Sequence, residues 1–416
     1  MATLHPFRAL RPRPEEAIRV AAVPYDVVTT DEARVLAAGN PLSFLRVSRP
    51  ELELPVGTDP HADEVYQRAA ENFERLKKDV FVLEDEPSVY FYRLRRGEHE
   101  QTGLAACCSL DDYDRNIIKK HERTRRDKED DRTRHMIALG AQTGPVFLTY
   151  RRSNDVEAIA ARATKSNPLF DFEAADGVRH AVWRVGGQDR DAVVSAFAAI
   201  PSLYIADGHH RAASAARART DIRERTGGDD VHGDAADSTT FLAVAFPHDQ
   251  VQILSYNRIV KDWGGRSPDD VLAAVRRGFT VKAGPASPAR RGDIAMYVNR
   301  TWWTLRLQAA PDPSDAADRS DATSSLDVSV LHHHVLEPIL GIGDIRTDPR
   351  IDFIGCARGT GELERLVDSG NAAVAFSLYP VSVTDLMAVS DAGAIMPPKS
   401  TWFEPKLRDG LLIHLI

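Results

Sequence analysis

Strand-like and helix-like hydrophobic patterns follow one another along the 416-residue chain. Short apolar runs bounded by turn residues, typical of strands, occur in SVYFYRLRR (88–96), GPVFLTY (144–150) and FLAVAFP (241–247). Between them, ADEVYQRAAENFERLKKD (62–79) and DVEAIAARATK (155–165) carry apolar residues at the spacing of an amphipathic helix. The pattern predicts a mixed α/β (α+β) protein.

Two polar segments interrupt this pattern. RTGGDDVHGDAADSTT (225–240) and AAPDPSDAADRSDATSS (309–325) contain too few large apolar residues to be buried, which indicates exposed loops. With the first as a boundary, we predict a core over residues 1–240 and a C-terminal α/β region over residues 241–416.

The charge of the chain restricts the partners that it can have. The 53 Lys and Arg residues against 61 Asp and Glu residues give a net charge of −8, so no general attraction to nucleic acid or to an anionic membrane is expected. No apolar run of about 18 residues occurs, and the first 20 residues lack the apolar stretch of a secretory signal. We therefore expect a cytoplasmic protein, while the sequence leaves a homodimer open.

The chain has three cysteines, Cys107, Cys108 and Cys356. Three thiols cannot form a disulfide framework or a four-thiolate zinc site. We expect all three to be reduced residues of the core.

The stretch YIADGHHRAASAA (204–216) carries the clearest chemical signal. It reads as a strand that ends at Asp207, a glycine turn, and a helix whose first turn holds two histidines and Arg211. Backbone N–H groups at a helix start bind anions, and an arginine offers a planar set of donors to phosphate oxygens. The stretch predicts a phosphate site, with a plain helix cap at Asp207 as the alternative.

The DGHHRAASA segment resembles the Gly-x-x-Arg-x-x-Ala signature of the ParB and sulfiredoxin-like superfamily. The whole chain is similar to domain of unknown function family 1015, through VPYDVV (23–28), NPLSFLRVSRPE (40–51), KHERTRRDKEDDR (120–132), DGHHR (207–211) and MPPKSTWFEPKL (396–407). The resemblance implies a ParB/sulfiredoxin-like core that holds nucleotide phosphates at the start of a helix. The superfamily includes free serine kinases, so the resemblance also implies a phosphotransferase.

A carboxylate near the N-terminus is a candidate base. Asp26 follows Pro24 and Tyr25 and precedes a helix for which we predict Thr30 as the N-cap. Kinases commonly use an aspartate to accept the proton of the attacking alcohol, and in the related serine kinases the resemblance implies an acidic residue from this part of the chain. The alternative is that Asp26 stabilises its own turn.

The segment KKHERTRRDKEDDRTRHM (119–136) is dominated by charge. As a solvated helix it would be held by pairs four residues apart, such as Arg123 with Asp127. The family resemblance instead marks His121 and Glu122 as motif positions that bind substrate or help to hold a metal.

The loop MPPKST (396–401) offers a cation and two hydroxyl groups, Lys399, Ser400 and Thr401, after two stiff prolines. It lacks the glycines of a P-loop, and a rigid turn before the last strand is the alternative. A departure from the family occurs at Asn257-Arg258, where we expect His-Arg in many relatives, so no role of that histidine can be transferred.

The segment LDVSVLHHHVLEPILG (326–341) fits a helix that Pro338 interrupts. Three adjacent histidines on a helix point in different directions. This favours an ordinary helix face over a metal site.

These signals favour a kinase that transfers a phosphoryl group from ATP or ADP, with Mg²⁺, to the hydroxyl of a free amino acid such as serine. A ParB-like nucleotide-binding or nucleotide-hydrolysing regulatory module is the alternative, although no basic DNA-reading segment is visible. A metal hydrolase is disfavoured because no His-Glu-x-x-His motif occurs. We assign catalysis to Asp26, His209 and His210; nucleotide and phosphate binding to Asp207, Gly208, His209, His210, Arg211, Lys399, Ser400 and Thr401; substrate binding to Tyr25, His121, Glu122 and Arg123; and Mg²⁺ binding to Asp207.

Overall fold

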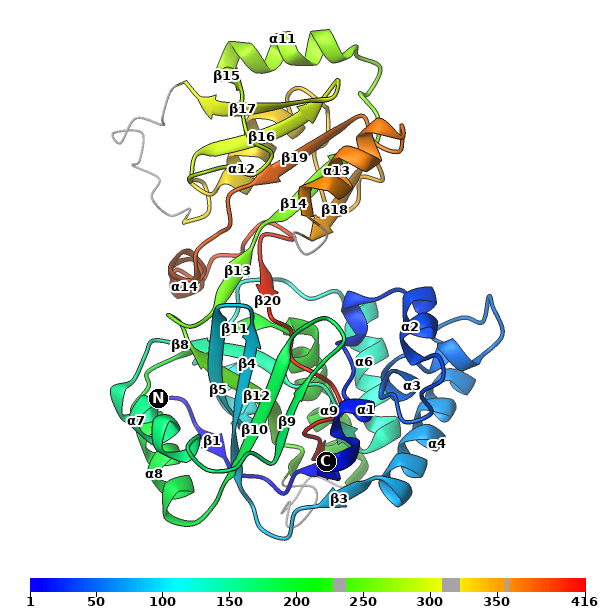
Figure 1. The fold of residues 1–416 in the computed structure, drawn as a ribbon, viewed down its shortest axis with the longest axis vertical. Coiled ribbons are helices and arrows are strands. Elements are labelled where there is room, and N and C mark those ends of the chain that lie inside the picture. The colour runs from blue at the N-terminus through cyan, green and yellow to red at the C-terminus, as the bar shows by residue number, and fades with distance from the viewer. Residues whose placement is uncertain (227–236, 309–321, 356–358) are drawn as a thin grey trace. The chain divides into compact units, whose positions relative to one another are not determined.

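The computed structural model describes residues 1–226, 237–308, 322–355 and 359–416. These residues form two compact units, Met1–Val251 with Pro405–Ile416, and Gln252–Glu404 (Figure 1). Both units contain helices and sheets, so the predicted mixed α/β class is confirmed. Cys356 and most residues of the two predicted polar loops lie outside the described residues.

A mixed sheet forms the centre of the first unit. Its strand order is β6-β11-β8-β12-β5-β4-β10-β9, and β1 pairs with β5. The pairs β11 with β6 and β12 with β8 are parallel, and the others are antiparallel. The strands are β1 (Leu4–His5), β4 (Val89–Arg96), β5 (His99–Ser109), β6 (Ile118–Lys119), β8 (Val146–Tyr150), β9 (Phe170–Glu173), β10 (Arg179–Val185), β11 (Leu203–Asp207) and β12 (Thr240–Pro247).

The chain does not pass from the first unit to the second at the predicted boundary between residues 240 and 241. That position falls inside β12, a strand held on both sides by β5 and β8, so a division there would cut the sheet. The chain leaves the first unit after Val251 and returns to it at Pro405.

Helices and short strands complete the first unit. The helices are α1 (Ala17–Val20), α2 (Thr30–Ala37), α3 (Leu45–Ser48), α4 (Asp63–Asp79), α5 (Leu110–Asp114), α6 (Arg126–Leu139), α7 (Asn154–Ala163), α8 (Gly187–Ala198) and α9 (His209–Thr226), and the short strand pairs are β2 (Leu10–Pro12) with β3 (Phe81–Leu83) and β7 (Ala141–Gln142) with β21 (His414–Leu415).

Two apolar clusters hold these elements together. The larger joins the sheet to α7, α8 and α9, and the smaller joins α2, α3 and α4 around Phe44, Phe73 and Phe81. Cys107 and Cys108 are buried free thiols on β5, as predicted. Burial of this apolar surface is the main force that stabilises the unit.

Two local predictions for the first unit were wrong. The N-cap of α2 is Thr29 and not Thr30: Thr29 Oγ1 accepts from Glu32 N at 3.2 Å, and Thr29 N donates to Glu32 Oε2 at 2.8 Å, which forms a capping box. The predicted Arg123–Asp127 helix pair does not form, because α6 begins only at Arg126 and Asp127 binds Arg125 instead.

The second unit has an antiparallel sheet with the order β15-β17-β16-β19-β14-β18. The predicted helix at 326–341 is α12 followed by a π-helical turn, η5 (His332–Leu336), which ends before Pro338. The elements are β13 (Gln252–Leu254), β14 (Tyr256–Val260), α11 (Pro268–Gly278), β15 (Phe279–Ala283), β16 (Asp293–Val298), β17 (Thr301–Leu307), α12 (Asp327–Leu331), β18 (Ile351–Gly355), α13 (Gly359–Asp368), β19 (Val374–Leu378), α14 (Val383–Asp391) and β20 (Trp402–Glu404), which pairs with β13.

No helix within the described residues is both long enough and apolar enough to cross a membrane.

Candidate functional site

The turn from β11 to α9 has the predicted form. Asp207 ends the strand, Gly208 has a φ of 97°, and His209 begins an 18-residue helix. A Cβ atom at Gly208 would lie 3.0 Å from Cζ of Arg211, so both the backbone conformation and the close approach favour glycine. The first N–H groups of the helix are therefore held beside a compact turn, as an anion site requires.

Two cations meet the carboxylate of Asp207. Its Oδ2 accepts from Arg211 NH2 at 3.2 Å and from Lys406 Nζ at 3.4 Å. Burial alone would raise the pKa of Asp207, but Lys406 and Arg211 outweigh it and hold this pKa well below its usual range. The carboxylate is therefore ionised at neutral pH, with both cations next to it.

These contacts argue against the predicted Mg²⁺ site at Asp207. Mg²⁺ requires near-octahedral coordination by oxygen atoms. One carboxylate oxygen of Asp207 is already engaged by Arg211 and Lys406, and their positive charges would repel a divalent ion. The residues at this turn fit an anion better than Mg²⁺.

Arg211 lies inside the unit, with 8% of its surface exposed. Its NH1 group donates to the carbonyl of Pro145, and its Nε has no hydrogen-bond partner among the residues that the structure describes. Burial opposes the charge of Arg211, but Asp207, Asp26 and Asp409 together raise its pKa. Arg211 is thus a permanently charged group surrounded by carboxylates.

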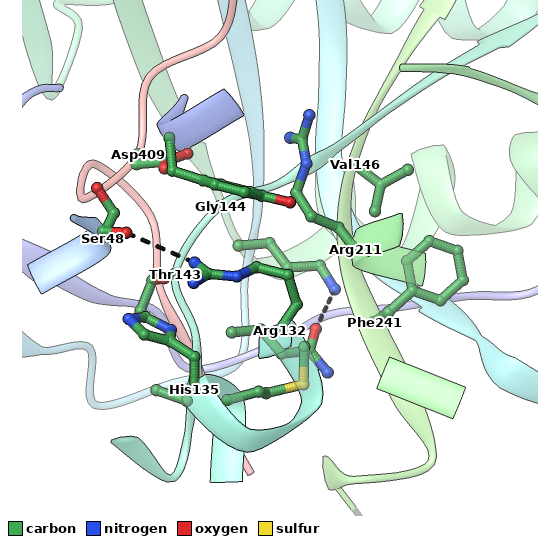
Figure 2. Close-up of a pocket in the computed structure, with 14 residues that line it drawn as sticks. Ser48, Arg132, His135, Thr143, Gly144, Val146, Arg211, Phe241 and Asp409 are labelled. Carbon is green, nitrogen blue, oxygen red and sulfur yellow. Dashed lines mark hydrogen bonds between the residues drawn. The ribbon is translucent and has the colours of Figure 1, made fainter. Parts of the chain in front are cut away.

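A cavity of about 40 Å³ adjoins Arg211 (Figure 2). Arg132 NH1 donates to the carbonyl of Ser48 at 3.5 Å, and the Arg132 guanidinium lies 4.3 Å from the ring centre of Tyr25. This volume holds about two or three water molecules, so a nucleotide would have to bind outside it. The lining residues are Tyr25, Ser48, Arg132, His135, Met136, Ala141, Gln142, Thr143, Gly144, Val146, Arg211, Phe241, Leu242 and Asp409.

Asp409 is an acid in an unusual setting on this cavity. It is only 3% exposed, and burial, which Arg211 only partly offsets, raises its pKa to about 7. A Cβ atom at Gly144 would lie 2.7 Å from Asp409 Oδ1, so the backbone at residue 144 passes directly against the carboxyl group. Asp409 can therefore gain or lose a proton near neutral pH.

Asp26 lies in the same electrostatic environment. It is exposed, in the short 3₁₀ helix η2 (Tyr25–Val27), and its charge acts on both Arg211 and Asp409. Burial raises the pKa of the neighbouring Tyr25, so its hydroxyl stays protonated. The structure thus places residues 25 and 26 within electrostatic reach of Arg211 in the 207–211 turn.

The segment 121–125 is fastened to the start of α9 by the two histidines. His121 N donates to His209 Nε2 at 3.4 Å, and Arg125 N donates to His210 Nε2 at 3.1 Å. The rings of His121 and His209 meet edge to face, with their centres 4.4 Å apart. His121 and Glu122 therefore lie at the turn, whereas the predicted substrate residue Arg123 is exposed. The catalytic roles of His209 and His210 stay predictions.

The loop with Lys399, Ser400 and Thr401 belongs to the second unit. The buried Arg258 donates to the carbonyls of Pro398 at 3.4 Å and of Lys399 at 3.1 Å, and Ser400 Oγ donates to the Pro397 carbonyl at 2.6 Å. Lys399 has a φ of 56°, an uncommon conformation that these bonds hold in place. The predicted role of the loop in phosphate binding stays a prediction.

Sequence reasoning missed Lys406 and Asp409. Both come from the last 12 residues, which return to the first unit, and Lys406 is 199 positions from its partner Asp207. Lys406 stands in the quoted motif at 396–407, but no local spacing connects it to the DGHHR turn.

The chain belongs to the family described as "Protein of unknown function (DUF1015)", which matches residues 4–329. No curated protein matches it. A conserved hypothetical protein from Pyrococcus furiosus is similar, with a TM-score of 0.34 and 13% identity over 75% of this chain and 95% of that one. A mutant of free serine kinase in complex with ADP has a TM-score of 0.33 and 14% identity over 74% and 92%. A C-terminally truncated SbnI from Staphylococcus aureus has a TM-score of 0.37 and 13% identity, over 73% of this chain and 85% of that one.

Proposed function

We propose that this protein transfers a phosphoryl group from ATP or ADP to the hydroxyl of a small metabolite, with free serine as the first acceptor to test. The observation that carries the proposal is the convergence of a glycine turn, a helix start, two cations and an exposed carboxylate at one place. A kinase needs all of these parts, whereas a structural helix cap needs none of the cations.

The anion part of the site is the start of α9. Its first N–H groups provide backbone donors, and Lys406 and Arg211 place positive charge beside them. Both cations form ion pairs with the Asp207 carboxylate, so an incoming phosphate would compete with this carboxylate for them. The exchange is favourable if the phosphates carry more negative charge than the carboxylate.

Asp26 is the base in this proposal. The acceptor oxygen forms a bond to the terminal phosphorus, the bond from phosphorus to the leaving nucleotide oxygen breaks, and the hydroxyl proton passes to the Asp26 carboxylate. Negative charge that develops on the leaving phosphate is stabilised by Lys406 and Arg211. Because Asp26 is exposed, a small acceptor can reach it.

The test is a reaction of the purified protein with ATP or ADP and a panel of amino acids and small polyols, followed by phosphorus NMR for a new phosphomonoester. Asp26→Asn should lower the rate by orders of magnitude and leave nucleotide affinity intact. Asp31→Asn, at an exposed carboxylate on α2 that pairs with Arg34, is the matched control and should react normally.

The regulatory alternative predicts a different result. A ParB-like module would bind the nucleotide through the same turn but would form no phosphomonoester with any acceptor. In both cases Lys406→Met should weaken nucleotide binding by about tenfold or more, because a charged hydrogen bond contributes about 1.5–3 kcal/mol. Unchanged affinity, measured by calorimetry, would remove the turn from both hypotheses.

A further inference from the structure

A cluster of two histidines and a glutamate lies next to the DGHHR turn. One ring nitrogen each of His121 and His209 and a carboxylate oxygen of Glu122 lie within 4.8 Å of one another. His209 Nδ1 is 3.9 Å from Glu122 Oε2. The two histidines come from segments 88 positions apart in the chain, so the cluster is a product of the fold.

His121 is arranged as metal-binding histidines are. Its side chain is 2% exposed, and it hydrogen-bonds the backbone of Ile205. The other ring nitrogen, Nδ1, is buried without a hydrogen-bond partner among residues 1–226, 237–308, 322–355 and 359–416. Histidines that bind metals commonly donate one ring N–H to a backbone carbonyl and direct the other nitrogen to the ion. An unpartnered buried nitrogen otherwise carries a desolvation cost.

The charge around the cluster also suits a cation, because the carboxylate of Asp207 acts electrostatically on both histidine rings.

We infer that His121, Glu122 and His209 bind a divalent transition-metal ion, with Zn²⁺ as the best match. Two imidazoles and one carboxylate are a donor set that suits Zn²⁺ and related ions, whereas Mg²⁺ prefers oxygen atoms alone. Three protein ligands leave at least one coordination position for water or for an oxygen of a bound molecule.

The geometry needs only a small adjustment to close around an ion. Ligands of a tetrahedral Zn²⁺ at about 2.0–2.1 Å lie roughly 3.4 Å apart. Glu122 is 41% exposed and can move the required distance. His209 Nδ1, the ring nitrogen 3.9 Å from Glu122 Oε2, can bind the ion only in the tautomer that carries the proton on Nε2. This tautomer gives up the bond from His121 N to His209 Nε2, which at 3.4 Å is long and contributes little stability.

A second cluster of the same composition provides an internal comparison. His332, His333 and Glu337 in the second unit also lie within 4.8 Å of one another. There the side chains of His333 and Glu337 are 61% and 56% exposed, so solvent competes for their ligand atoms. Because the first cluster has two buried histidines, we assign the tight site to it alone.

The experiment is a calorimetric titration of the chelator-treated full chain with Zn²⁺ and, separately, with Mg²⁺, in buffer without nucleotide. One equivalent of Zn²⁺ should bind far more tightly than Mg²⁺. Glu122→Gln should weaken Zn²⁺ binding by at least the roughly 10–100-fold that loss of an outer-shell partner costs, and His209→Ala should abolish it. The visible absorption of bound Co²⁺ should change in Glu122→Gln as a second readout of the ligand.

His333→Ala is the matched control and should still bind one equivalent of Zn²⁺ tightly. Circular dichroism establishes that each variant is folded, and Glu122→Gln keeps the test valid if His209→Ala does not fold. Zn²⁺ that binds no better than Mg²⁺, that is unaffected by Glu122→Gln, or that is lost in His333→Ala would overturn the inference. Since no nucleotide is present, metal binding and phosphoryl transfer can fail independently of each other.

Discussion

The two units each bury an arginine, and they stabilise it in opposite ways. In the first unit Arg211 is surrounded by Asp207, Asp26 and Asp409, which raise its pKa. In the second unit Arg258, 1% exposed, donates only to carbonyls, those of Tyr256, Pro398 and Lys399, among the hydrogen bonds of the described residues. Burial lowers the pKa of Arg258 to about 10, which still leaves it charged at neutral pH.

The two arginines differ in whether the groups around them can titrate: carboxylates surround Arg211, and backbone carbonyls accept from Arg258. Carboxylates around a cation can gain or lose protons, so the first arrangement can respond to pH. Backbone carbonyls do not titrate, so the second arrangement holds the backbone at Tyr256, Pro398 and Lys399 independently of pH in the neutral range. We therefore expect the first unit to depend on pH and the second to depend on geometry.

The largest expected effect is at Asp409, the acid that Arg211 does not fully neutralise. Its pKa is raised to about 7 in the folded state, from 3.8. An acid with a raised pKa lowers stability as the pH rises from about 4 to 7, because only the unfolded chain releases the proton. Asp409→Asn should therefore stabilise the protein by up to about 4 kcal/mol at pH 8. Urea unfolding should show almost no difference at pH 4.

A constant difference between Asp409→Asn and the parent across this pH range would contradict the titration of Asp409. Asp249→Asn, at a more exposed carboxylate that pairs with Arg152, is the control and should show no comparable stabilisation at pH 8.

The next effect tests whether the stability that Arg258 contributes to the second unit is independent of pH. Arg258→Met removes a charged donor from three carbonyls, each such bond being worth about 1.5–3 kcal/mol, while the new side chain recovers some apolar burial. A loss of about 3 kcal/mol is expected, equal at pH 6 and pH 9. Hydrogen exchange resolved by peptide should show faster exchange in residues 396–401.

Arg258→Lys is the matched variant for this test, since it keeps the charge but cannot reach several carbonyls in one plane. It should recover only part of the loss. A full recovery would mean that charge alone matters, and a loss that varies with pH would show an unrecognised titrating partner.

The same contrast explains how much could be predicted from the sequence. The strand, turn and helix around DGHHR were predicted because a cap, a glycine and a helix start are local signals. Lys406 could not be connected to Asp207, nor Asp409 to Arg211, because contacts across about 200 positions leave no spacing pattern. The hydrogen bond from the backbone N–H of Arg125 to the ring of His210 could not be predicted for the same reason. The N-cap of α2 was misplaced by one residue because two adjacent threonines, Thr29 and Thr30, offer the same cap chemistry.

A smaller effect follows from a buried histidine of the first unit. His135 Nε2 bonds to the Val47 carbonyl at 2.8 Å, and burial, with the nearby Arg132, lowers its pKa to about 3. Below pH 6.5 only the unfolded chain takes up the proton, so stability falls as the pH falls. His135→Gln, which can still donate to Val47, should reduce this acid-induced loss by about 2 kcal/mol at pH 5. Urea unfolding between pH 7.5 and 5 measures it, and His5→Gln, at an exposed histidine, should leave the loss unchanged.

The smallest effect concerns the capping box, a helix cap that occurs in both units and to which the contrast between the two arginines should not extend. Thr29 with Glu32 caps α2, and Ser382 with Asp385 caps α14 through the same reciprocal bonds. Because a cap acts within one helix turn, Thr29→Ala and Ser382→Ala should each cost about 1 kcal/mol, whatever the surrounding unit. Peptide-resolved hydrogen exchange should show the change within α2 in the first variant and within α14 in the second. If either substitution altered exchange in the elements that hold Arg211 or Arg258, local and long-range stabilisation would be coupled, and the contrast between the two units would have to be redrawn.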